Sequence, residues 1–170
     1  MQKMDIFLAE VEVAFLKLKM KIIATNKSAS FEYFILQTLE AGIVLNGSEV
    51  KSMRFKNVNI KDNFIRIIRT EAFLFNMHIA FLDTTNPHFK PLNTPKKLLL
   101  HKREINKLHS LVSTKGHSLI ALKLYFNSKN ILKVQIALVK GKKLYDKRED
   151  LKKKDIYLEE KRNFKIKNLI

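Results

Sequence analysis

The sequence predicts a mainly β fold with short helices, arranged as a small antiparallel barrel that is flanked by two or three helices and followed by a basic tail. Short apolar segments with strand periodicity recur between residues 31 and 139 and are separated by turn residues. Two intervening segments instead have helical apolar spacing with end signals. Beyond residue 140 the apolar pattern fades while the basic residues continue. We therefore expect an N-terminal extension of uncertain status (1–20), a barrel domain (21–144) and a basic C-terminal tail (145–170).

The composition limits the class of protein and the kind of partner. The chain has 170 residues, with 33 Lys and Arg against 16 Asp and Glu, which gives a formal net charge of +17. Such an excess predicts attraction to polyanions, of which nucleic acid is the commonest, although a membrane surface or an acidic protein would satisfy the same electrostatics. The chain has no cysteine, and no segment approaches the ~18 apolar residues of a membrane span. We expect a soluble, cytoplasmic protein that does not bind membranes.

The first half of the chain contains one long strand and one capped helix. Residues 4–20 have the apolar spacing of an amphipathic helix, but Met20 could equally be the natural start, and no function is assigned there. Residues 31–39 place Phe31, Tyr33, Ile35 and Leu39 on one face of a strand that continues to residue 45. Asn46 and Glu49 have the spacing of a capping box, which predicts a helix over residues 47–55. That helix would turn Val50 and Met53 towards the core and Lys51 and Arg54 towards solvent.

The middle of the chain predicts a hairpin, a long loop and a second helix. Residues 58–68 and 72–79 are expected to form two strands that meet at a turn near residues 69–71, although the turn lacks glycine. Residues 80–97 carry all three prolines and predict a loop of the length that is often functional. Residues 98–100 lead into a helix over residues 101–114, with Gly116 as its stop.

Two further strands complete the barrel. Residues 119–126 and 131–139 both have strand patterns and are joined at residues 127–130. In the second of them, Leu132, Val134, Ile136 and Leu138 alternate with Lys133 and Gln135, which is typical of a half-buried strand. Barrels of the oligonucleotide-binding type have this size, and they bind RNA or DNA on one face and its loops.

The tail has a different character from the barrel. From Lys140 onwards the sequence contains twelve Lys or Arg and six Asp or Glu, and its apolar residues have no strong regular spacing. Such a segment buries too little surface to order itself, so we expect it to be flexible or marginally helical until an acidic partner holds it.

Enzyme and metal chemistry have little support in the sequence. It contains no glycine-rich phosphate loop, no nucleophile elbow and no paired carboxylates in an apolar setting. The five histidines do not have the i, i+4 spacing of a helical zinc site, and no thiolate is available. We expect no catalytic residue, no metal and no cofactor.

Four separate runs resemble those of one protein family. They are Glu40 to Leu45, Gly47 to Arg54, Lys97 to Ile105 and Gly141 to Arg148. In their order and spacing they are similar to SmpB, the SsrA-binding protein family, over about residues 22–165. The resemblance implies an oligonucleotide-binding-like barrel that holds the tRNA-like part of transfer-messenger RNA. It also implies entry into stalled bacterial ribosomes, where the tail becomes helical in the decoding centre and the empty mRNA channel.

The resemblance also assigns roles to individual residues. The RNA-binding or surface-shaping residues that it implies are Asn26, Glu40, Leu100, Lys140, Lys142 and Lys143. We also expect RNA contacts from Lys51, Arg54, His101 and Lys102, which lie in the resembling runs. The tail residues that it implies to reach the decoding centre and ribosomal RNA are Tyr145, Asp146, Lys147, Arg148, Lys152 and Lys154, and we expect Lys153 to act with them. The implied partners are transfer-messenger RNA, the small-subunit ribosomal RNA and, through the bound RNA, elongation factor Tu. Tyr145 departs from the His of many members, but either ring stacks on a base.

Plainer alternatives remain for these residues and for the function. Glu40 could simply pair with a surface cation at a strand end, Asp146 could be the N-cap of a tail helix, and the lysines after residue 139 could be a solvated charge run. A general RNA-binding or ribosome-associated barrel would bind unrelated structured RNAs equally well. A small nuclease is a third hypothesis, which incubation of labelled RNA with and without a divalent metal would test.

Overall fold

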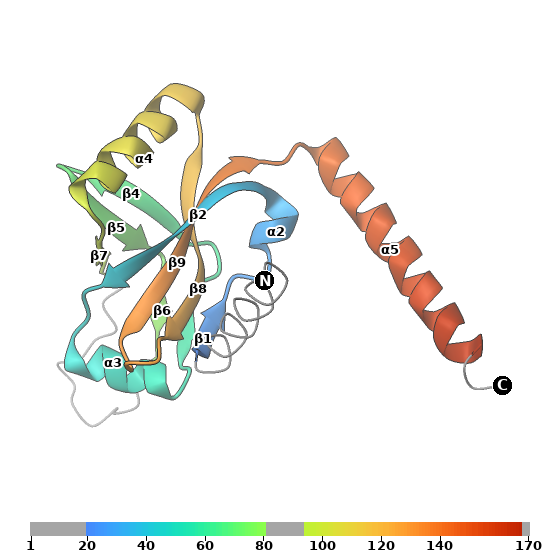
Figure 1. Cartoon of the computed structure of the whole chain (residues 1–170), viewed down its shortest axis with the longest axis horizontal. Helices are drawn as coiled ribbons and strands as arrows, with labels where there is room; N and C mark the ends of the chain where they lie inside the picture. Colours follow the sequence, from blue (N-terminus) through green and yellow to red (C-terminus); the bar gives the residue numbers. More distant parts are fainter. Residues whose placement is uncertain (1–19, 81–93, 168–170) are drawn as a thin grey trace, which may run out of the picture.

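The computed structural model describes residues 20–80 and 94–167, which form a ring of strands, two helices beside the ring, a helical turn on its outer face and a projecting C-terminal helix (Figure 1). The elements, in chain order, are β1 (Lys21–Thr25), α2 (Ala29–Glu32), β2 (Tyr33–Ile43), α3 (Gly47–Arg54), β3 (Val58–Asn59), β4 (Phe64–Ile68), β5 (Glu71–Phe75), β6 (His78–Ile79), β7 (Lys96–Leu99), α4 (Lys102–Lys115), β8 (Ser118–Phe126), β9 (Leu132–Gly141) and α5 (Leu144–Lys167).

The main sheet closes on itself. Its strands follow the order β1, β8, β4, β5, β7, β2 and β9, and an additional pairing between β8 and β9 completes the ring. All the pairings are antiparallel. The strand β8 carries the closure because it pairs with β9 along one edge and with both β1 and β4 along the other. The predicted mainly β fold with flanking helices and a closed antiparallel arrangement is confirmed.

The core fills the inside of this ring. Val134 and Ile136 of β9 are fully buried and Leu138 nearly so, while Lys133 and Gln135 lie on the other face, as their alternation predicted. Met53 from α3 and Leu108 from α4 pack against the same core cluster. Both helices therefore cover the ring with the faces that the sequence predicted to be apolar.

A second, smaller core lies on the outer face of β8 and β9. Ala29 of α2 packs there against Ile120, Leu122, Ala137 and Val139. The prediction that Phe31 begins a strand was wrong, because residues 29–32 form the helical turn that covers this outer patch. The strand begins only at Tyr33, which packs against the same patch.

The helix boundaries agree with their capping signals. The backbone N–H of Asn46 donates to Glu49 at 3.0 Å, and that of His101 donates to Glu104 at 2.8 Å, so a glutamate reaches back to the start of each helix. Helix α4 ends at Gly116, whose φ of 60° is the left-handed conformation that a glycine C-cap adopts readily.

The predicted hairpin is present, but its strands are shorter than expected. The segment 58–68 is interrupted before β4 and the segment 72–79 after β5, where Asp62 and Asn76 have positive φ. The outer ends, β3 and β6, pair in a separate two-stranded sheet. Arg69 and Thr70 form the turn with φ of 48° and 65°, so both central residues are left-handed without a glycine. For the β-branched Thr70, this conformation is strained.

Two strands of the ring were not predicted. β1 has only five residues, and β7 falls where a loop and the entry to a helix were expected. The segment 96–99 is short and begins with two lysines, so it carries little strand periodicity. Lys96 is nevertheless buried, because its ammonium group pairs with the buried carboxylate of Glu49. The predictions for residues 1–19 and for most of the loop 80–97 lie outside the described residues.

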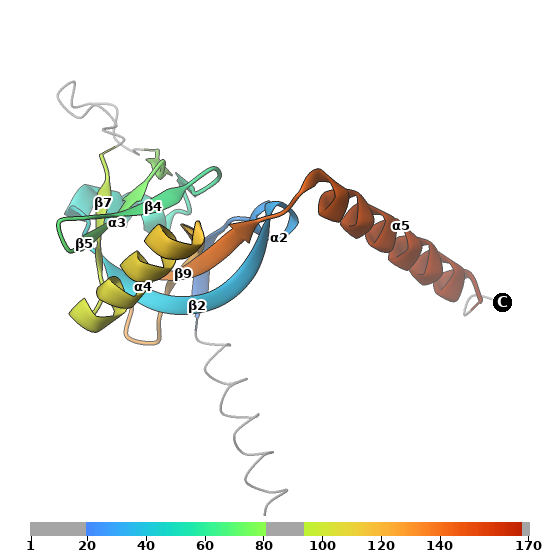
Figure 2. The ribbon, with the colours of Figure 1, turned by 90° about the horizontal axis from the view of Figure 1, so that it is seen from above.

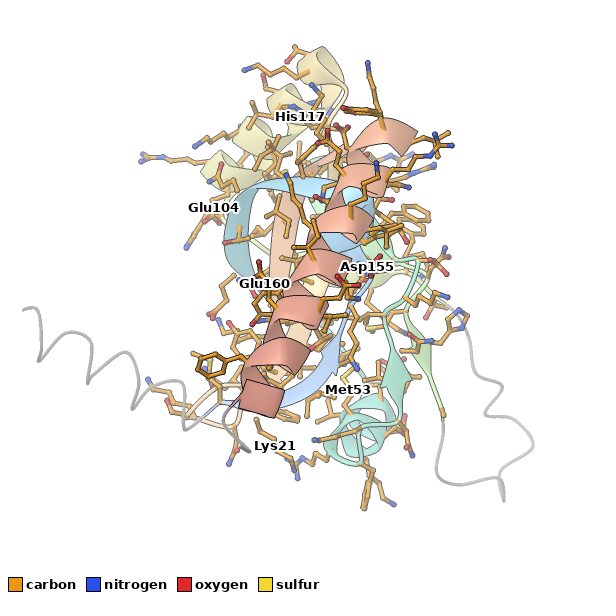
Figure 3. The ribbon with its side chains drawn as sticks, turned by 90° about the vertical axis from the view of Figure 1, so that its right-hand side faces the viewer. Lys21, Met53, Glu104, His117, Asp155 and Glu160 are labelled. Carbon is orange, nitrogen blue, oxygen red and sulfur yellow. The ribbon has the colours of Figure 1, made fainter. Side chains whose placement is uncertain are left out.

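The tail is a continuous helix that leaves the ring (Figure 2). Among the side chains of α5 that the structure describes, the partly buried ones lie in the first two turns, and residues 151–161 are all exposed. Charged side chains stand out from several sides of α5, Asp155 and Glu160 among them (Figure 3). The structure shows the tail as a 24-residue helix, and the expectation that it is flexible or marginally helical without an acidic partner stays a prediction. Strong helix formers, with no glycine or proline, favour the helical conformation.

No helix in the described part of the chain has the length and apolar character needed to cross a membrane.

Candidate nucleic-acid interface

The largest hollow that we describe, about 700 Å³, lies where β2, β7 and β9 meet the start of α4. Strand β2 pairs with both of the other strands, so the ring itself brings these segments together. Gly42 is opposite Leu99 across β2 and β7, where an added Cβ atom would meet the Leu99 Cβ at 3.2 Å. The hollow is lined by Glu40, Gly42, Thr70, Glu71, Lys97, Leu98, Leu99, Leu100, His101, Lys102, Glu104, Ile105 and Lys133.

Four of the predicted RNA-binding residues line this hollow together. Glu40 comes from the middle of β2, while Leu100, His101 and Lys102 come from the junction between β7 and α4, about sixty positions later in the chain. His101 and Lys102 are exposed, and Leu100 is half-buried. The tertiary structure therefore unites two of the four runs on which the resemblance rests.

Glu40 is held by two neighbours on the outer face of the sheet. Its carboxylate accepts a hydrogen bond from the Tyr125 hydroxyl group and lies 3.1 Å from the Lys133 ammonium group. The hydrogen bond from Tyr125 lowers the pKa of Glu40, Lys133 adds to this effect, and partial burial opposes it. Burial, followed by the contact with Glu40, raises the pKa of Tyr125. Glu40 is thus ionised at neutral pH, and it orients Lys133.

The other carboxylates of the hollow also have partners. Glu71 pairs with Lys97 across β5 and β7, and Glu104 accepts from the His101 backbone. Leu99 provides an apolar surface that is 54% exposed. This combination suits a nucleotide. The apolar surface can contact a base or a sugar, the carboxylates can accept hydrogen bonds from amino or hydroxyl groups, and the lysines can donate to a phosphate.

Sequence reasoning assigned four residues of this hollow to a site and missed the other nine. Lys133, Lys97 and Thr70 are the missed residues that add a lysine or a hydroxyl donor. Lys133 could have been found, because its place on the polar face of a predicted strand was recognised. Lys97 lies on β7 and Thr70 lies on the hairpin turn. Their proximity to Glu40 depends on the pairing of strands across the ring, so the sequence alone does not predict it.

Asn26 lies elsewhere and has a local structural role. Its backbone N–H donates to the Leu122 carbonyl oxygen at 2.8 Å, and its side-chain oxygen accepts from the Ser28 hydroxyl group at 2.9 Å. These bonds shape the turn between β1 and α2. Asn26 is therefore placed to shape the surface near α2 and does not line the hollow that contains Glu40.

Lys51 and Arg54 are exposed on α3, as predicted, but away from Glu40. Arg54 lines a smaller hollow of about 230 Å³ with Lys21, Phe126 and Asn130. The two exposed cations of α3 therefore extend the basic surface to the end of the ring where β8 turns into β9.

The three lysines at the end of β9 differ in their surroundings. Lys140 and Lys143 are exposed to solvent. The side chain of Lys142 is only 9% exposed, and its ammonium group donates to the Ser30 carbonyl oxygen at 2.7 Å and to Asp150 at 2.6 Å. Two of the three lysines are thus available to an anionic partner, whereas Lys142 is engaged inside the protein.

The first turns of α5 contain the other predicted tail residues. Tyr145 is 70% exposed, and a hydrogen bond with Glu149 is the main cause that raises its pKa. Asp146 was predicted as a possible N-cap, but it lies inside the first turn and accepts from the Lys143 backbone N–H at 2.9 Å. It reaches back to the helix start from the third helical position, as a capping-box acid does.

The remaining basic residues of the tail are on the surface. The Lys147 ammonium group lies 5.8 Å from the centre of the Phe31 ring, and Arg148 is exposed. Lys152, Lys153 and Lys154 are exposed on α5, and Lys154 lines a hollow of about 600 Å³ together with Ser30 and Phe31. Within the described ranges, no three His, Asp or Glu residues are grouped so that they could hold a metal ion.

Comparisons with known proteins agree with this arrangement. The family model described as "SmpB protein" matches residues 23–166. A protein of Helicobacter hepaticus named "SsrA-binding protein" is 58% identical over 146 residues, which cover 85% of this chain and 94% of the relative. A protein of the same name from Nitratiruptor sp. is 57% identical over 136 residues, or 79% of this chain and 91% of the relative.

A solved structure extends the comparison to the fold. A chain from the structure described as "tmRNA-SmpB: a journey to the center of the bacterial ribosome" is 40% identical to this one and superposes with a TM-score of 0.59. The match covers 72% of this chain and 85% of that one. The fold and the sequence therefore point to the same group of proteins.

Proposed function

This chain belongs to the SmpB protein family, and on that premise we propose that it binds the tRNA-like part of transfer-messenger RNA and delivers it to stalled bacterial ribosomes. The relatives are named for binding SsrA RNA, and the similar solved chain is described in the context of the bacterial ribosome. The chain would act as an RNA-binding protein and not as an enzyme. Since its proposed partners are RNA and ribosomes, it would work in the cytoplasm.

The observation that carries the proposal is the hollow around Glu40. It combines residues from two of the resembling runs with an apolar floor and lysine donors. Lys102 and Lys133 are suited to phosphates, and Glu40 is suited to the amino group of a base edge. Leu99 and Leu100 would lie against a sugar or a base. An RNA of tRNA-like shape would be recognised by this surface as a whole, with elongation factor Tu reached only through the bound RNA.

The exposed lysines and the tail would serve the second partner. We assign Lys140, Lys143 and the exposed side of α5 to contacts with RNA, including the small-subunit ribosomal RNA. Tyr145 and Arg148 would reach the decoding centre, and Lys152 to Lys154 would lie along the empty mRNA channel. The exposed Lys152, Lys153 and Lys154 suit a channel walled by phosphates.

Competition between RNAs tests the proposed specificity. Labelled transfer-messenger RNA bound to the chain is challenged with bulk tRNA, or with unlabelled transfer-messenger RNA, at one fixed salt concentration. We expect the cognate RNA to compete at much lower concentrations than bulk tRNA. Equal competition would instead favour a general structured-RNA-binding protein.

Substitution of Lys102 tests the proposed surface. Lys102→Met should weaken binding of transfer-messenger RNA and lower the salt dependence by about one unit of slope, as expected for one lost phosphate contact. Lys115→Met is the matched control, because Lys115 is also exposed but lies at the opposite end of the same helix and does not line the hollow. If the two variants bind alike, the hollow around Glu40 is not the RNA site.

Truncation tests the proposed role of the tail. A chain that ends at Leu151 keeps Asp150, and with it the contact that holds the first turns of α5. It should bind transfer-messenger RNA within about threefold of the full chain, because a few lost long-range charges alter affinity only modestly. It should nevertheless fail to support tagging of stalled peptides on ribosomes. Tagging at the full rate would contradict the proposed function of the tail.

A further inference from the structure

Lys142 contacts three separate elements at the point where the chain leaves the ring. Its ammonium group donates to the Ser30 carbonyl oxygen of α2 at 2.7 Å and to Asp150 of α5 at 2.6 Å. The same group lies 5.0 Å from the centre of the Phe34 ring on β2. Its backbone N–H also donates to the Glu32 carbonyl oxygen at 2.9 Å. Lys142 therefore joins the body to the tail helix.

The burial of Lys142 distinguishes it from its neighbours. Its side chain is 9% exposed, whereas Lys140 and Lys143 are exposed to solvent. A lysine that contacts phosphate needs an ammonium group that the anion can reach, and the side chain of Lys142 is less exposed than that of Lys133, which pairs with Glu40 but is 27% exposed. Lys142 instead already has a carboxylate, a carbonyl oxygen and an aromatic ring around it, so a phosphate would have to displace Asp150.

A second contact lies on the same side of α5. Lys147 lies over the Phe31 ring of α2 at 5.8 Å, three positions before Asp150 in the helix. Together the two contacts cover only the first two turns of α5, which are the turns with partly buried residues. The next turn, through Leu151 and Lys154, lines a hollow with Ser30 and Phe31 of the body, so the direction of the helix depends on contacts at and near this joint.

We propose that Lys142 is a positioning residue that sets the direction of the tail helix through Ser30, Phe34 and Asp150, and that it is not itself a contact to RNA. This inference deepens the proposed function and rests on it, because a correctly directed helix is what would place the tail in the ribosome. It also assigns different roles to adjacent lysines, with Lys143 facing the RNA and Lys142 holding the helix.

The direction of α5 can be measured in the free protein. The chain has no cysteine, so spin labels at Ser128→Cys and Glu159→Cys report one distance between the ring and the tail. We expect a narrow distribution by double electron–electron resonance in the parent protein. Lys142→Met should broaden or shift it, and Asp150→Asn should do so to a smaller extent because Ser30 and Phe34 remain. Lys143→Met is the matched control and should leave the distance unchanged.

RNA binding and tagging separate the two roles. For binding of transfer-messenger RNA, the slope of log K against log salt concentration should be the same in Lys142→Met as in the parent, and about one unit smaller in Lys143→Met. Lys142→Met should nevertheless fail to support tagging of stalled peptides. Circular dichroism confirms that each variant is folded. An unchanged label distance in Lys142→Met overturns the positioning role, and a loss of slope equal to that of Lys143→Met overturns the claim that Lys142 does not contact RNA. The distance measurement needs no RNA, so it stands even if the proposed function fails.

Discussion

Glu40 divides its carboxylate between a neutral donor and a cation. The Tyr125 hydroxyl group and the Lys133 ammonium group approach it from β8 and β9, the two strands that follow it across the outer face of the ring. A carboxylate repels phosphate, so the partners of Glu40 matter for the proposed RNA contact. They keep Glu40 ionised and fixed in place, and its side chain stays 49% exposed, so under the proposed function it would be open to the amino group of a base.

The pairing of Tyr125 with Glu40 predicts a loss of stability in alkali. The pKa of Tyr125 is raised in the folded chain above its value of about 10 in an unfolded chain. The folded state therefore holds this proton more tightly, so the stabilisation is complete below pH 10 and is lost as the pH rises towards the raised pKa. Between about pH 9 and pH 11, the free energy of unfolding in urea should fall further for the parent than for Tyr125→Phe. If the free energy of unfolding falls equally in the two proteins, the Tyr125 hydroxyl group does not have a raised pKa in the folded chain.

At the scale of single elements, a buried ion pair attaches α3 to β7. Lys96 donates to Glu49 and to Thr94, and both charged side chains of the pair are less than a tenth exposed. Glu49 also accepts the Asn46 backbone N–H at the start of α3. One carboxylate thus caps a helix and neutralises a buried strand lysine, which explains why so short and basic a strand fits into the ring.

The ion pair can be tested by a double-variant comparison. Lys96→Met should destabilise the fold by about 3–5 kcal/mol, because it leaves the Glu49 charge buried without a partner. Glu49→Gln/Lys96→Met should recover most of that loss, since the amide keeps the cap of α3 without a charge. Urea unfolding of both variants measures the difference. If the double variant is as unstable as Lys96→Met alone, the loss of stability comes from the change in side-chain packing at position 96 and not from the unpaired Glu49 charge.

For the whole molecule, the ring and the tail helix differ in how they are stabilised. The ring has an extensive buried core, whereas α5 relies on its own backbone hydrogen bonds after its first two turns. In proteins most helical stability comes from packing against other elements, and the far turns of α5 are exposed. The molecule therefore combines a stable platform with an element whose far end depends on its surroundings.

This difference predicts a gradient of amide exchange along the chain. Exchange should be slow in β8 and β9, intermediate over residues 144–150, and fast from residue 152 onwards, because opening the far turns of α5 exposes no core. Hydrogen exchange with mass spectrometry of the free chain measures it by peptide. Binding to ribosomes should slow exchange in the far part of α5. Protection there equal to that of β9 in the free chain would contradict this picture.

The sequence by itself determined the elements whose signals are local. The alternation in residues 132–138, the capping pairs Asn46 with Glu49 and His101 with Glu104, and the stop at Gly116 each depend on residues only a few positions apart. The resemblance to SmpB was also visible, because it rests on contiguous runs. These signals were sufficient for the fold class, for both helices beside the ring and for the family.

Only the tertiary structure decided which residues share a surface. Glu40, Lys102 and Lys133 come together because β2 pairs with both β7 and β9, and β7 has too little periodicity to be recognised in advance. Lys142 and Lys143 are adjacent in sequence and both basic, yet one turns into a joint between three elements and the other into solvent. That distinction depends on contacts more than a hundred positions apart, such as the one with Ser30, and local spacing carries no information about them.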